Sequence, residues 1–352
     1  MFGTYRTILA VMVVFTHLAG VRGSGSYAVF GFYTLSGYLM TLVMHRGYGY
    51  SATGFYQYGL NRALRVFPLY WVAALFSLVL ILWVGREFAV RYREVMSIPE
   101  GIWPVLQNIF IVFPPSSDTR LIPPAWSLTV EIFFYIVIGL GLSKTKRIAW
   151  AWFILSIAYH VMVSILHLGW AYKYHIIPAA SLPFSTGALV YLYKDEIRAL
   201  IGRLNHEYIP HLLVLLMFVN LEVSYLLGTT GGFSFYANYL INTAIVMSLS
   251  NRDSLFGIPG KFDKWMGEFS YPVFLIHYQV GLLVVIVLGM FGVGIARQDM
   301  SLAFVSLPVI AAIAWISIVT LERPMEIFRA KAKAGRHLVS RTRVGQADGK
   351  IG

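Results

Sequence analysis

Apolar runs long enough to cross a lipid bilayer recur along the whole sequence and are separated by short polar segments. A transmembrane helix needs roughly 17 to 25 predominantly apolar residues. The pattern predicts about ten such helices, over residues 4–22, 27–45, 66–84, 125–143, 147–167, 175–193, 209–227, 233–250, 269–290 and 301–321. It therefore predicts an all-α fold, a polytopic membrane helix bundle with one membrane domain over residues 1–325.

The longest connection between predicted helices, residues 86–124, contains an apolar stretch at 103–113 that is closed by two prolines. This stretch is too short to span a bilayer. Because unpaired backbone groups are excluded from the hydrocarbon, we expect it to lie at the membrane interface or to re-enter the helix bundle.

The composition supports a membrane protein, because 58% of the residues are hydrophobic and 12% are charged, whereas about a quarter of the residues of a soluble domain are charged. The chain has no cysteine, which excludes disulfides, thiolate metal sites and thiol nucleophiles. It also has no glycine-rich phosphate loop, zinc-type His-Glu cluster or nucleophile elbow. We therefore expect no metal, and soluble phosphotransfer and metalloprotease functions lose their support.

The basic residues are distributed unevenly between the two predicted sides of the membrane. With a cytoplasmic N-terminus, all but seven of the 28 Lys and Arg residues fall in cytoplasmic loops or helix ends. The seven exceptions are Arg22, Arg86, Arg91, Arg93, Arg120, Lys173 and Arg297. This bias follows the positive-inside rule and predicts that both termini are cytoplasmic.

The chain ends in its longest polar stretch, residues 326–352, in which basic residues outnumber acidic ones. We expect this stretch to be a flexible cytoplasmic tail that contacts anionic lipids of the bilayer. The net charge of +12 is attributed to such contacts and to the positive-inside rule, so no nucleic-acid partner is expected.

The first predicted helix carries Arg6 at its start and His17 deep inside it. Eleven residues separate them, which is about three turns plus about 20°, so both side chains leave the same face of the helix. His17 lies about 16 Å further along the helix axis, inside the hydrocarbon. An ionisable side chain at that depth is costly and indicates function. The alternative is a core histidine that hydrogen-bonds a backbone carbonyl.

Glu131 is a second ionisable group inside the predicted membrane, near the start of the helix at 125–143. At 1.5 Å per residue, Glu131 lies about 9 Å deep and His17 about 8 Å from the same surface. A buried carboxylate needs a partner, and a histidine paired with a carboxylate gains a fixed tautomer and a higher basicity. We therefore expect Glu131 to pair with His17. The alternative is a structural pair of Glu131 with an Arg or a Tyr hydroxyl.

Three further features lie near the ends of predicted helices. Arg62 and Arg65 lie three residues apart on one helical face, an arrangement that suits phosphate groups and also occurs in ordinary cytoplasmic anchors. The small residues Ser36 and Gly37 allow close helix packing or the approach of a ligand to His17. In the ninth predicted helix, His277 lies about 12 Å from the cytoplasmic surface.

A histidine, a carboxylate and cytosolic arginines fit proton transfer with a phosphate-bearing donor. A different class of protein remains open: a proton-coupled transporter or polysaccharide exporter in which His17 and Glu131 carry protons. A third alternative is a non-catalytic membrane partner that positions glycan enzymes.

With these residues the chain resembles the acyltransferase-3 family of bacterial integral membrane acyltransferases, from Gly3 to Pro324. The resemblance rests on the Arg-x10-His spacing of Arg6 and His17, the run from Phe32 to Gly37, Arg62-x-x-Arg65 with Pro68, Trp126-Ser127 with Glu131, Ser270-Tyr271 with His277, and Glu322-Arg323-Pro324. Two places depart from the family pattern. The run Gly3-Thr4-Tyr5-Arg6-Thr7 lacks the acidic residue and the Gly that commonly flank the first Arg, and Tyr33 replaces a Phe.

The resemblance implies a multi-pass, ten-helix protein of the bacterial inner membrane. Such a protein moves an acyl group, usually acetyl, from acetyl-CoA or another acyl-CoA as co-substrate to a hydroxyl of a carbohydrate or lipid-linked glycan acceptor. It also implies that Arg6 and His17 belong to the active site, and that Arg62 and Arg65 hold the donor.

On this basis we expect His17 to act as a general base on the acceptor hydroxyl, or to carry the acyl group covalently, with Glu131 orienting its imidazole. Arg6 is expected to help hold the donor phosphates. The remaining expected contacts are Tyr33 and Ser36 with the donor, and Trp126, Ser127 and His277 with the acceptor.

Overall fold

The computed structural model describes residues 2–115, 117, 119–201, 208–250 and 255–329, and the statements below concern these residues. They are mainly helical, and their only β pairing is an isolated bridge between Met96 and Arg120. The helices, with short 3-10 and π segments labelled η, are α1 (Gly3–Leu18), α2 (Ser24–Val43), η1 (Met44–Tyr48), α3 (Ala52–Val84), α4 (Arg86–Tyr92), α5 (Ile102–Phe110), η2 (Pro123–Ala125), α6 (Trp126–Val137), η3 (Ile138–Leu142), α7 (Lys146–Ile165), α8 (Trp170–Tyr174), α9 (Ile177–Leu192), α10 (Lys194–Ile201), α11 (Ile209–Leu226), α12 (Phe233–Leu249), α13 (Gly260–Met290), α14 (Met300–Ser317) and η4 (Ile318–Glu322).

Within the described residues, eight helices are long and apolar enough to cross a membrane. They are Ser24–Tyr48, Ala52–Val84, Pro123–Leu142, Lys146–Ile165, Trp170–Leu192, Ile209–Leu226, Gly260–Met290 and Met300–Arg329. These helices confirm an all-α protein with several candidate membrane spans. The other two predicted spans are shorter helices, α1 with 16 residues and α12 with 17, so the count of ten and the side of the termini stay predictions. Of the predicted tail at 326–352, the part beyond residue 329 lies outside the described residues.

Two helices begin well before the predicted starts at 66 and 269: α3 at Ala52 and α13 at Gly260. Their prolines, Pro68 and Pro272, are typical of helix starts but lie inside continuous helices here. The 33 residues of α3 extend about 50 Å, more than the roughly 30 Å of hydrocarbon in a bilayer. Arg62 and Arg65 therefore belong to the body of a long helix and not to a loop before it.

The first helix, α1, runs parallel to α13 and in register with it. Gly3 contacts Asp263 and His17 contacts His277, and both pairs are 260 positions apart in the sequence. The register is therefore constant over about 21 Å of helix, at 1.5 Å per residue. The two backbones approach closely at Gly3, where a Cβ atom would lie 1.5 Å from the Asp263 carbonyl oxygen. Only glycine permits this approach.

The buried carboxylate of Asp263 caps the N-terminus of α1. Its Oδ2 accepts from the Gly3 N–H at 2.9 Å, and its Oδ1 accepts from the Thr4 N–H and hydroxyl, each at 2.8 Å. The first turn of α1 contains no acidic residue of its own, so the cap comes from α13. A carboxylate at this position satisfies free backbone N–H groups and interacts favourably with the helix dipole, which is typically worth about 1 kcal/mol.

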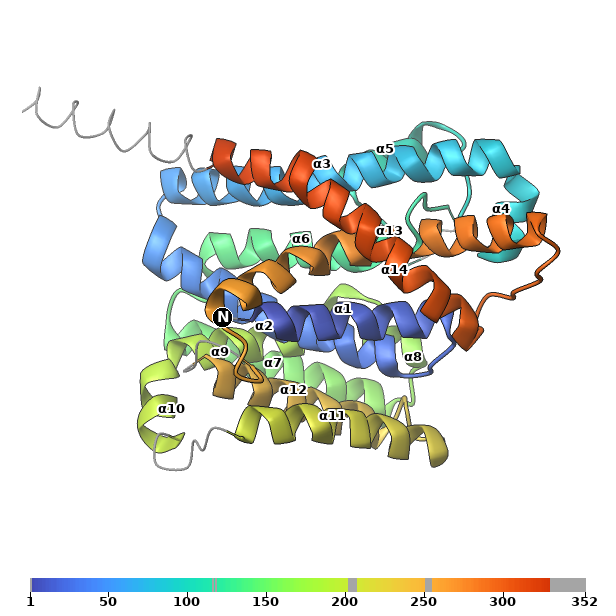
Figure 1. Ribbon diagram of the computed structural model, residues 1–352. Coiled ribbons are helices and arrows are strands. Elements are labelled where there is room, and N and C mark those ends of the chain that lie inside the picture. Colours follow the sequence, from blue (N-terminus) through green and yellow to red (C-terminus); the bar gives the residue numbers. More distant parts are fainter. Residues whose placement is uncertain (1, 116, 118, 202–207, 251–254, 330–352) are drawn as a thin grey trace, which may run out of the picture.

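Helices α1 and α2 lie in the middle of the bundle, between α3, α13 and α14 on one side and α7, α11 and α12 on the other (Figure 1). The other close helix pair joins α2 to α9 through Gly37 and Gly187. A Cβ atom on Gly187 would lie 1.9 Å from the Thr34 carbonyl oxygen, and one on Gly37 would lie 2.2 Å from the Phe184 carbonyl oxygen. The small residue Gly37 therefore serves helix packing.

His160 of α7 illustrates a structural role for an intramembrane histidine. Pro183 lies inside α9 and has no N–H to donate to the carbonyl four residues earlier, that of Ala179. The Nε2 of His160 lies 2.9 Å from this carbonyl oxygen, and its Nδ1 lies 3.1 Å from the Tyr236 hydroxyl. Both ring nitrogens therefore have structural partners.

The apolar stretch at 103–113, predicted to lie at the membrane interface or to re-enter the bundle, forms most of helix α5. Its outward side chains are apolar, with Ile102 82% and Trp103 67% exposed. On the inward side, buried Asn108 accepts from the Leu121 N–H and donates to the carbonyls of Pro104 and Thr119. An exposed apolar face on a short helix suits the membrane interface.

The close contact between α2 and α9 predicts the effect of one methyl group. Gly187→Ala would force the added Cβ into the Thr34 backbone, and we expect a loss of about 1–3 kcal/mol of stability or more. The control is Gly59→Ala in α3, where a Cβ meets nothing within 4 Å, and where alanine is expected to stabilise the helix by about 0.5–1 kcal/mol. Thermal unfolding in detergent measures both variants. Equal melting temperatures would contradict the packing described here.

Candidate active site

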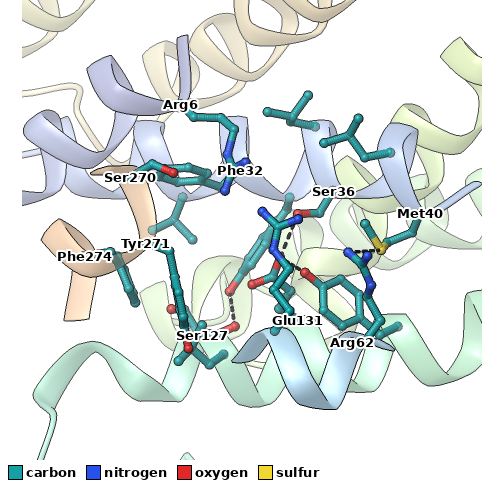
Figure 2. Close-up of a pocket in the computed structure, with 17 residues that line it drawn as sticks. Arg6, Phe32, Ser36, Met40, Arg62, Ser127, Glu131, Ser270, Tyr271 and Phe274 are labelled. Atoms are coloured by element: carbon teal, nitrogen blue, oxygen red, sulfur yellow. Dashed lines mark hydrogen bonds between the residues drawn. The ribbon is translucent and has the colours of Figure 1, made fainter. Parts of the chain in front are cut away.

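A cavity of about 90 Å³ lies in the bundle between α1, α2, α3, α6 and α13. We call it the arginine cavity, because three arginines line it (Figure 2). Seven of the predicted site residues line this cavity: Arg6, Tyr33, Ser36, Arg62, Arg65, Ser127 and Glu131. They come from four different helices, so only the packing of the bundle brings them together.

Glu131 is held by two hydroxyl groups in the arginine cavity. Its Oε1 accepts from the Ser36 hydroxyl at 2.8 Å and from the Tyr135 hydroxyl at 2.5 Å. Tyr135 lies one helical turn after Glu131, so α6 itself supplies this donor. The predicted pair of Glu131 with His17 is therefore wrong, and the alternative, a Tyr hydroxyl, is the contact that forms. Glu131 shares its cavity with Arg6, which lies at the opposite end of α1 from His17.

The three arginines face the arginine cavity without carboxylate partners. Arg62 donates to the Asn61 side-chain oxygen at 2.9 Å and lies 3.7 Å from the Met40 sulfur, and its buried Nε has no partner. In the described part of the chain, neither Arg6 nor Arg65 forms an ion pair within 4.0 Å. Because an unpaired buried cation is costly, this arrangement favours an anionic ligand.

A wider space of about 330 Å³, the mouth cavity, adjoins the arginine cavity. Arg6, Arg65 and Tyr271 line both spaces. Lys264 and Arg329 also line the mouth cavity, together with Glu268, Glu322 and Glu326. Lys264 forms an ion pair with Glu326 at 3.7 Å. The arginine cavity is therefore reached through an opening with a small excess of basic over acidic residues, at the end of the bundle that holds the N-terminus of α1.

His17 lies at the other end of α1 and contacts a second histidine. Its Nδ1 lies 2.9 Å from the Nε2 of His277, and the Nδ1 of His277 lies 2.8 Å from the carbonyl oxygen of Phe274. The carbonyl can only accept, so His277 Nδ1–H donates to it, and His277 Nε2 accepts from His17 Nδ1–H. This network leaves Nε2 of His17 unprotonated and able to accept a proton.

His17 lines two adjoining spaces of about 360 and 680 Å³, which together we call the histidine cavity. The residues common to both spaces are His17, Arg93, Pro124, Trp126 and His175. The Trp126 ring lies 4.8 Å from the His175 ring and 5.2 Å from that of Tyr174, centroid to centroid. The wall beside His17 is thus largely aromatic.

A thin partition separates the histidine cavity from the arginine cavity. Val29, Ser127 and Phe274 line both. Each of these side chains is less than 9% exposed. Ser127 also accepts, through its backbone carbonyl, from the Tyr33 hydroxyl at 3.3 Å. The three cavities therefore follow one another along α1, from the basic mouth to His17.

The structure also differs from the sequence prediction in the place of His277. The His277 side chain is fully buried behind His17, with 0% exposure. It contacts His17, which lines the histidine cavity, but it does not line the cavity itself. Sequence reasoning did not identify Tyr135, Phe274 or Arg93. The spacing of Tyr135 from Glu131, four residues on one helix, could have indicated the first, whereas a loop arginine such as Arg93 carries no local signal.

Comparison with known proteins adds two findings. A family model described as an acyltransferase domain matches residues 4–321. An O-acetyl transferase of Shigella phage Sf6 is 25% identical over 164 residues, a match that covers 42% of this chain and 46% of that relative. The chain thus matches less than half the length of this relative. No solved structure gives a significant match.

The two-histidine network predicts the tautomer of His17. In His277→Leu the acceptor for Nδ1–H is lost, so we expect the proton to move to Nε2 in a large part of the molecules. In His277→Gln the side-chain oxygen reaches about the place of the missing Nε2, and the wild-type tautomer is expected to persist. Nitrogen NMR of histidine-labelled protein reports both states. Identical His17 signals in the two variants would contradict the network.

Proposed function

The chain belongs to the acyltransferase family whose model matches residues 4–321, and on that premise we propose that it moves an acyl group from acyl-CoA to a hydroxyl of a carbohydrate or lipid-linked glycan. One observation carries the proposal: His17, with a free Nε2, faces a cavity that adjoins three unpaired arginines. Membership of this family favours an enzyme over the transporter and partner-protein alternatives. The acyl group we propose is acetyl, the group named by the phage relative.

The donor would enter through the mouth cavity. The arginine cavity, at about 90 Å³, suits a narrow chain such as pantetheine, whereas the mouth cavity, at about 330 Å³, is wider. Phosphates of the nucleotide would bind Arg65 and Arg329, and Lys264 would exchange its ion pair with Glu326 for a phosphate contact, because guanidinium and ammonium groups are the donors that phosphates prefer. The pantetheine arm would then extend past Arg6 and Arg62 toward the partition.

In the transfer step, Nε2 of His17 accepts the proton of the acceptor hydroxyl. The oxygen attacks the thioester carbonyl, and collapse of the tetrahedral intermediate breaks the carbon–sulfur bond. The departing CoA thiolate takes the proton back from His17, so that atoms and charges balance. General-base catalysis of this kind typically contributes about 10²- to 10⁴-fold to a rate.

His277 takes the orienting role that the sequence prediction gave to Glu131. It does not face the cavity, so it is a positioning residue that holds His17 in the required tautomer. Glu131, bonded to Ser36 and Tyr135 among the arginines, instead reduces the excess positive charge around the donor. It is therefore expected to affect donor binding more than proton transfer.

A covalent variant is also supported by one observation, the partition between the two cavities. His17 lies on the far side of it from the basic mouth, so Nε2 could first take the acyl group itself and pass it to the acceptor. Radiolabelled acetyl-CoA added without acceptor distinguishes the two routes. Label retained by the wild type and absent from His17→Ala supports the acyl-histidine, and an unlabelled wild type supports direct transfer.

The distribution of charge supports a cytoplasmic donor and the predicted inner-membrane topology. Basic residues at the end of the bundle that holds the mouth cavity include Arg46, Lys144, Lys146, Arg147, Lys194, Arg198, Lys261, Lys264, Arg323 and Arg329. Under the positive-inside rule this end faces the cytoplasm. Acyl-CoA would then bind from the cytoplasm, and the histidine cavity would open toward the other side of the membrane.

We expect His17→Ala to lose acyl transfer, by about 10²- to 10⁴-fold, because the variant lacks the imidazole that accepts the hydroxyl proton in this mechanism. The assay follows release of free CoA from acetyl-CoA with a panel of sugar acceptors, using a thiol reagent. The chain has no cysteine, so the protein itself gives no background. His160→Gln serves as the control at a buried histidine away from the cavities. A near wild-type rate in His17→Ala would refute the proposal.

Arg62→Gln tests the donor site. Loss of one charge-assisted contact with phosphate or with the donor amides, worth roughly 1.5–3 kcal/mol, should raise the KM for acyl-CoA about 10- to 100-fold. The KM for the acceptor should stay unchanged. Arg46→Gln is the matched control, because Arg46 is exposed and lies at the same end of the chain's helices. If both variants behave alike, the arginine cavity does not hold the donor.

A further inference from the structure

Arg93 lies beside His17 in the histidine cavity, at the end of α4. It lines both spaces that form this cavity. It directly follows the short helix α4, which comes after α3, and it is far in sequence from both α1 and α13. Its guanidinium therefore reaches the site only because of how this connecting segment folds back over the bundle.

The segment around Arg93 is held firmly against the bundle. The neighbouring Tyr92 is 7% exposed, and burial raises the pKa of its phenol. Its ring lies 6.4 Å from that of Tyr278, in an edge-on contact. Beyond Arg93, the Val95 carbonyl accepts from the Arg120 N–H at 2.8 Å. These contacts on both sides fix the position of the Arg93 backbone.

Arg93 lacks the carboxylate partners that its neighbours have. Arg86 forms an ion pair with Glu100, and Arg91 forms one with Glu87. The Arg93 Nε is buried and has no hydrogen-bond partner, and its side chain forms no ion pair in the described part of the chain. Of these three arginines, the one that faces the cavity is the one whose charge is not balanced.

The lining of the histidine cavity leaves this charge unopposed. Among its described lining residues, Arg93 and Arg120 are cationic and none is Asp or Glu. The rest of the wall is rich in proline and aromatic side chains, including Trp126 and Phe113. In such surroundings an unpaired guanidinium attracts an anion much more strongly than it would in water.

We propose that Arg93 binds an oxyanion of the acceptor, a carboxylate or a phosphate, close to the hydroxyl that His17 deprotonates. This inference rests on the proposed function, because it assigns the acceptor to the histidine cavity. The planar guanidinium matches both groups by paired hydrogen bonds. A neutral acceptor would leave the cation desolvated and unpaired, so Arg93 selects for acidic acceptors and against neutral ones.

Three sugar probes that differ only at C6 test the proposal: methyl glucoside, the corresponding glucuronic acid glycoside and the 6-phosphate. Saturation-transfer NMR on protein in lipid nanodiscs measures their binding without any reaction. We expect the wild type to bind at least one anionic probe about tenfold or more tightly than the neutral one. The tighter of the two anionic probes identifies carboxylate or phosphate as the preferred group.

The variants assign this preference to one side chain. Arg93→Gln should bind all three probes alike, and Arg93→Lys, which keeps the charge, should retain part of the preference. Arg91→Gln is the matched control, because it removes an equal charge two residues away from an exposed position, and it should behave as the wild type. A wild type without preference for an anionic probe, or a preference that survives in Arg93→Gln, would overturn the proposal.

The same probes separate this inference from the proposed function. Anion binding that depends on Arg93, without CoA release that depends on His17, would leave the anion site in place and refute the acyltransfer mechanism. CoA release that depends on His17, with no preference for anionic probes, would support the acyltransfer mechanism and refute the anion site. Equal losses for neutral and anionic probes in Arg93→Gln would indicate a structural role for Arg93 and overturn the proposal.

Discussion

Asp263 and His277, both on α13, hold α1 at its two ends. The parallel register between these helices sets the depth of Arg6 and of His17 at the same time, because both side chains belong to one rigid rod about 16 Å apart. The close approach at Gly3 leaves no room for a side chain at this point of the contact. The cavities follow from the register: the arginine cavity opens along the first half of α1, and the histidine cavity along the second.

The polar and charged groups inside the bundle differ in whether they have partners within the protein. His160 is a fully paired histidine with a structural role, and it bonds the carbonyl left free by Pro183. Arg6, Arg62, Arg65 and Arg93 line the cavities and form no ion pair within 4.0 Å in the described part of the chain. Desolvating an unpaired cation is costly, so such residues favour the binding of an anionic ligand. These cavity arginines therefore differ from His160 in leaving their charge available to a ligand.

The prediction for Glu131 shows how far reasoning from single helices extends. Depth along each helix placed Glu131 level with His17, and chemistry made the pair attractive. Depth does not specify which faces of two helices meet, however, and α6 turns Glu131 toward Ser36 and the arginines. His277 satisfies His17 instead, because α13 runs parallel to α1 and presents a ring nitrogen at the matching turn.

The sequence by itself determined the all-α membrane class, most helix positions and seven residues that line one cavity. It could do so because hydrophobic runs and intramembrane ionisable groups are local signals, read within one helix at a time. Only the tertiary structure decided the partners of His17 and Glu131 and the place of Arg93 beside His17. It also showed that α3 and α13 begin well before the predicted membrane spans. These partners and placements depend on helix rotation, register and the path of a connecting segment, which are fixed by contacts between residues far apart in the chain.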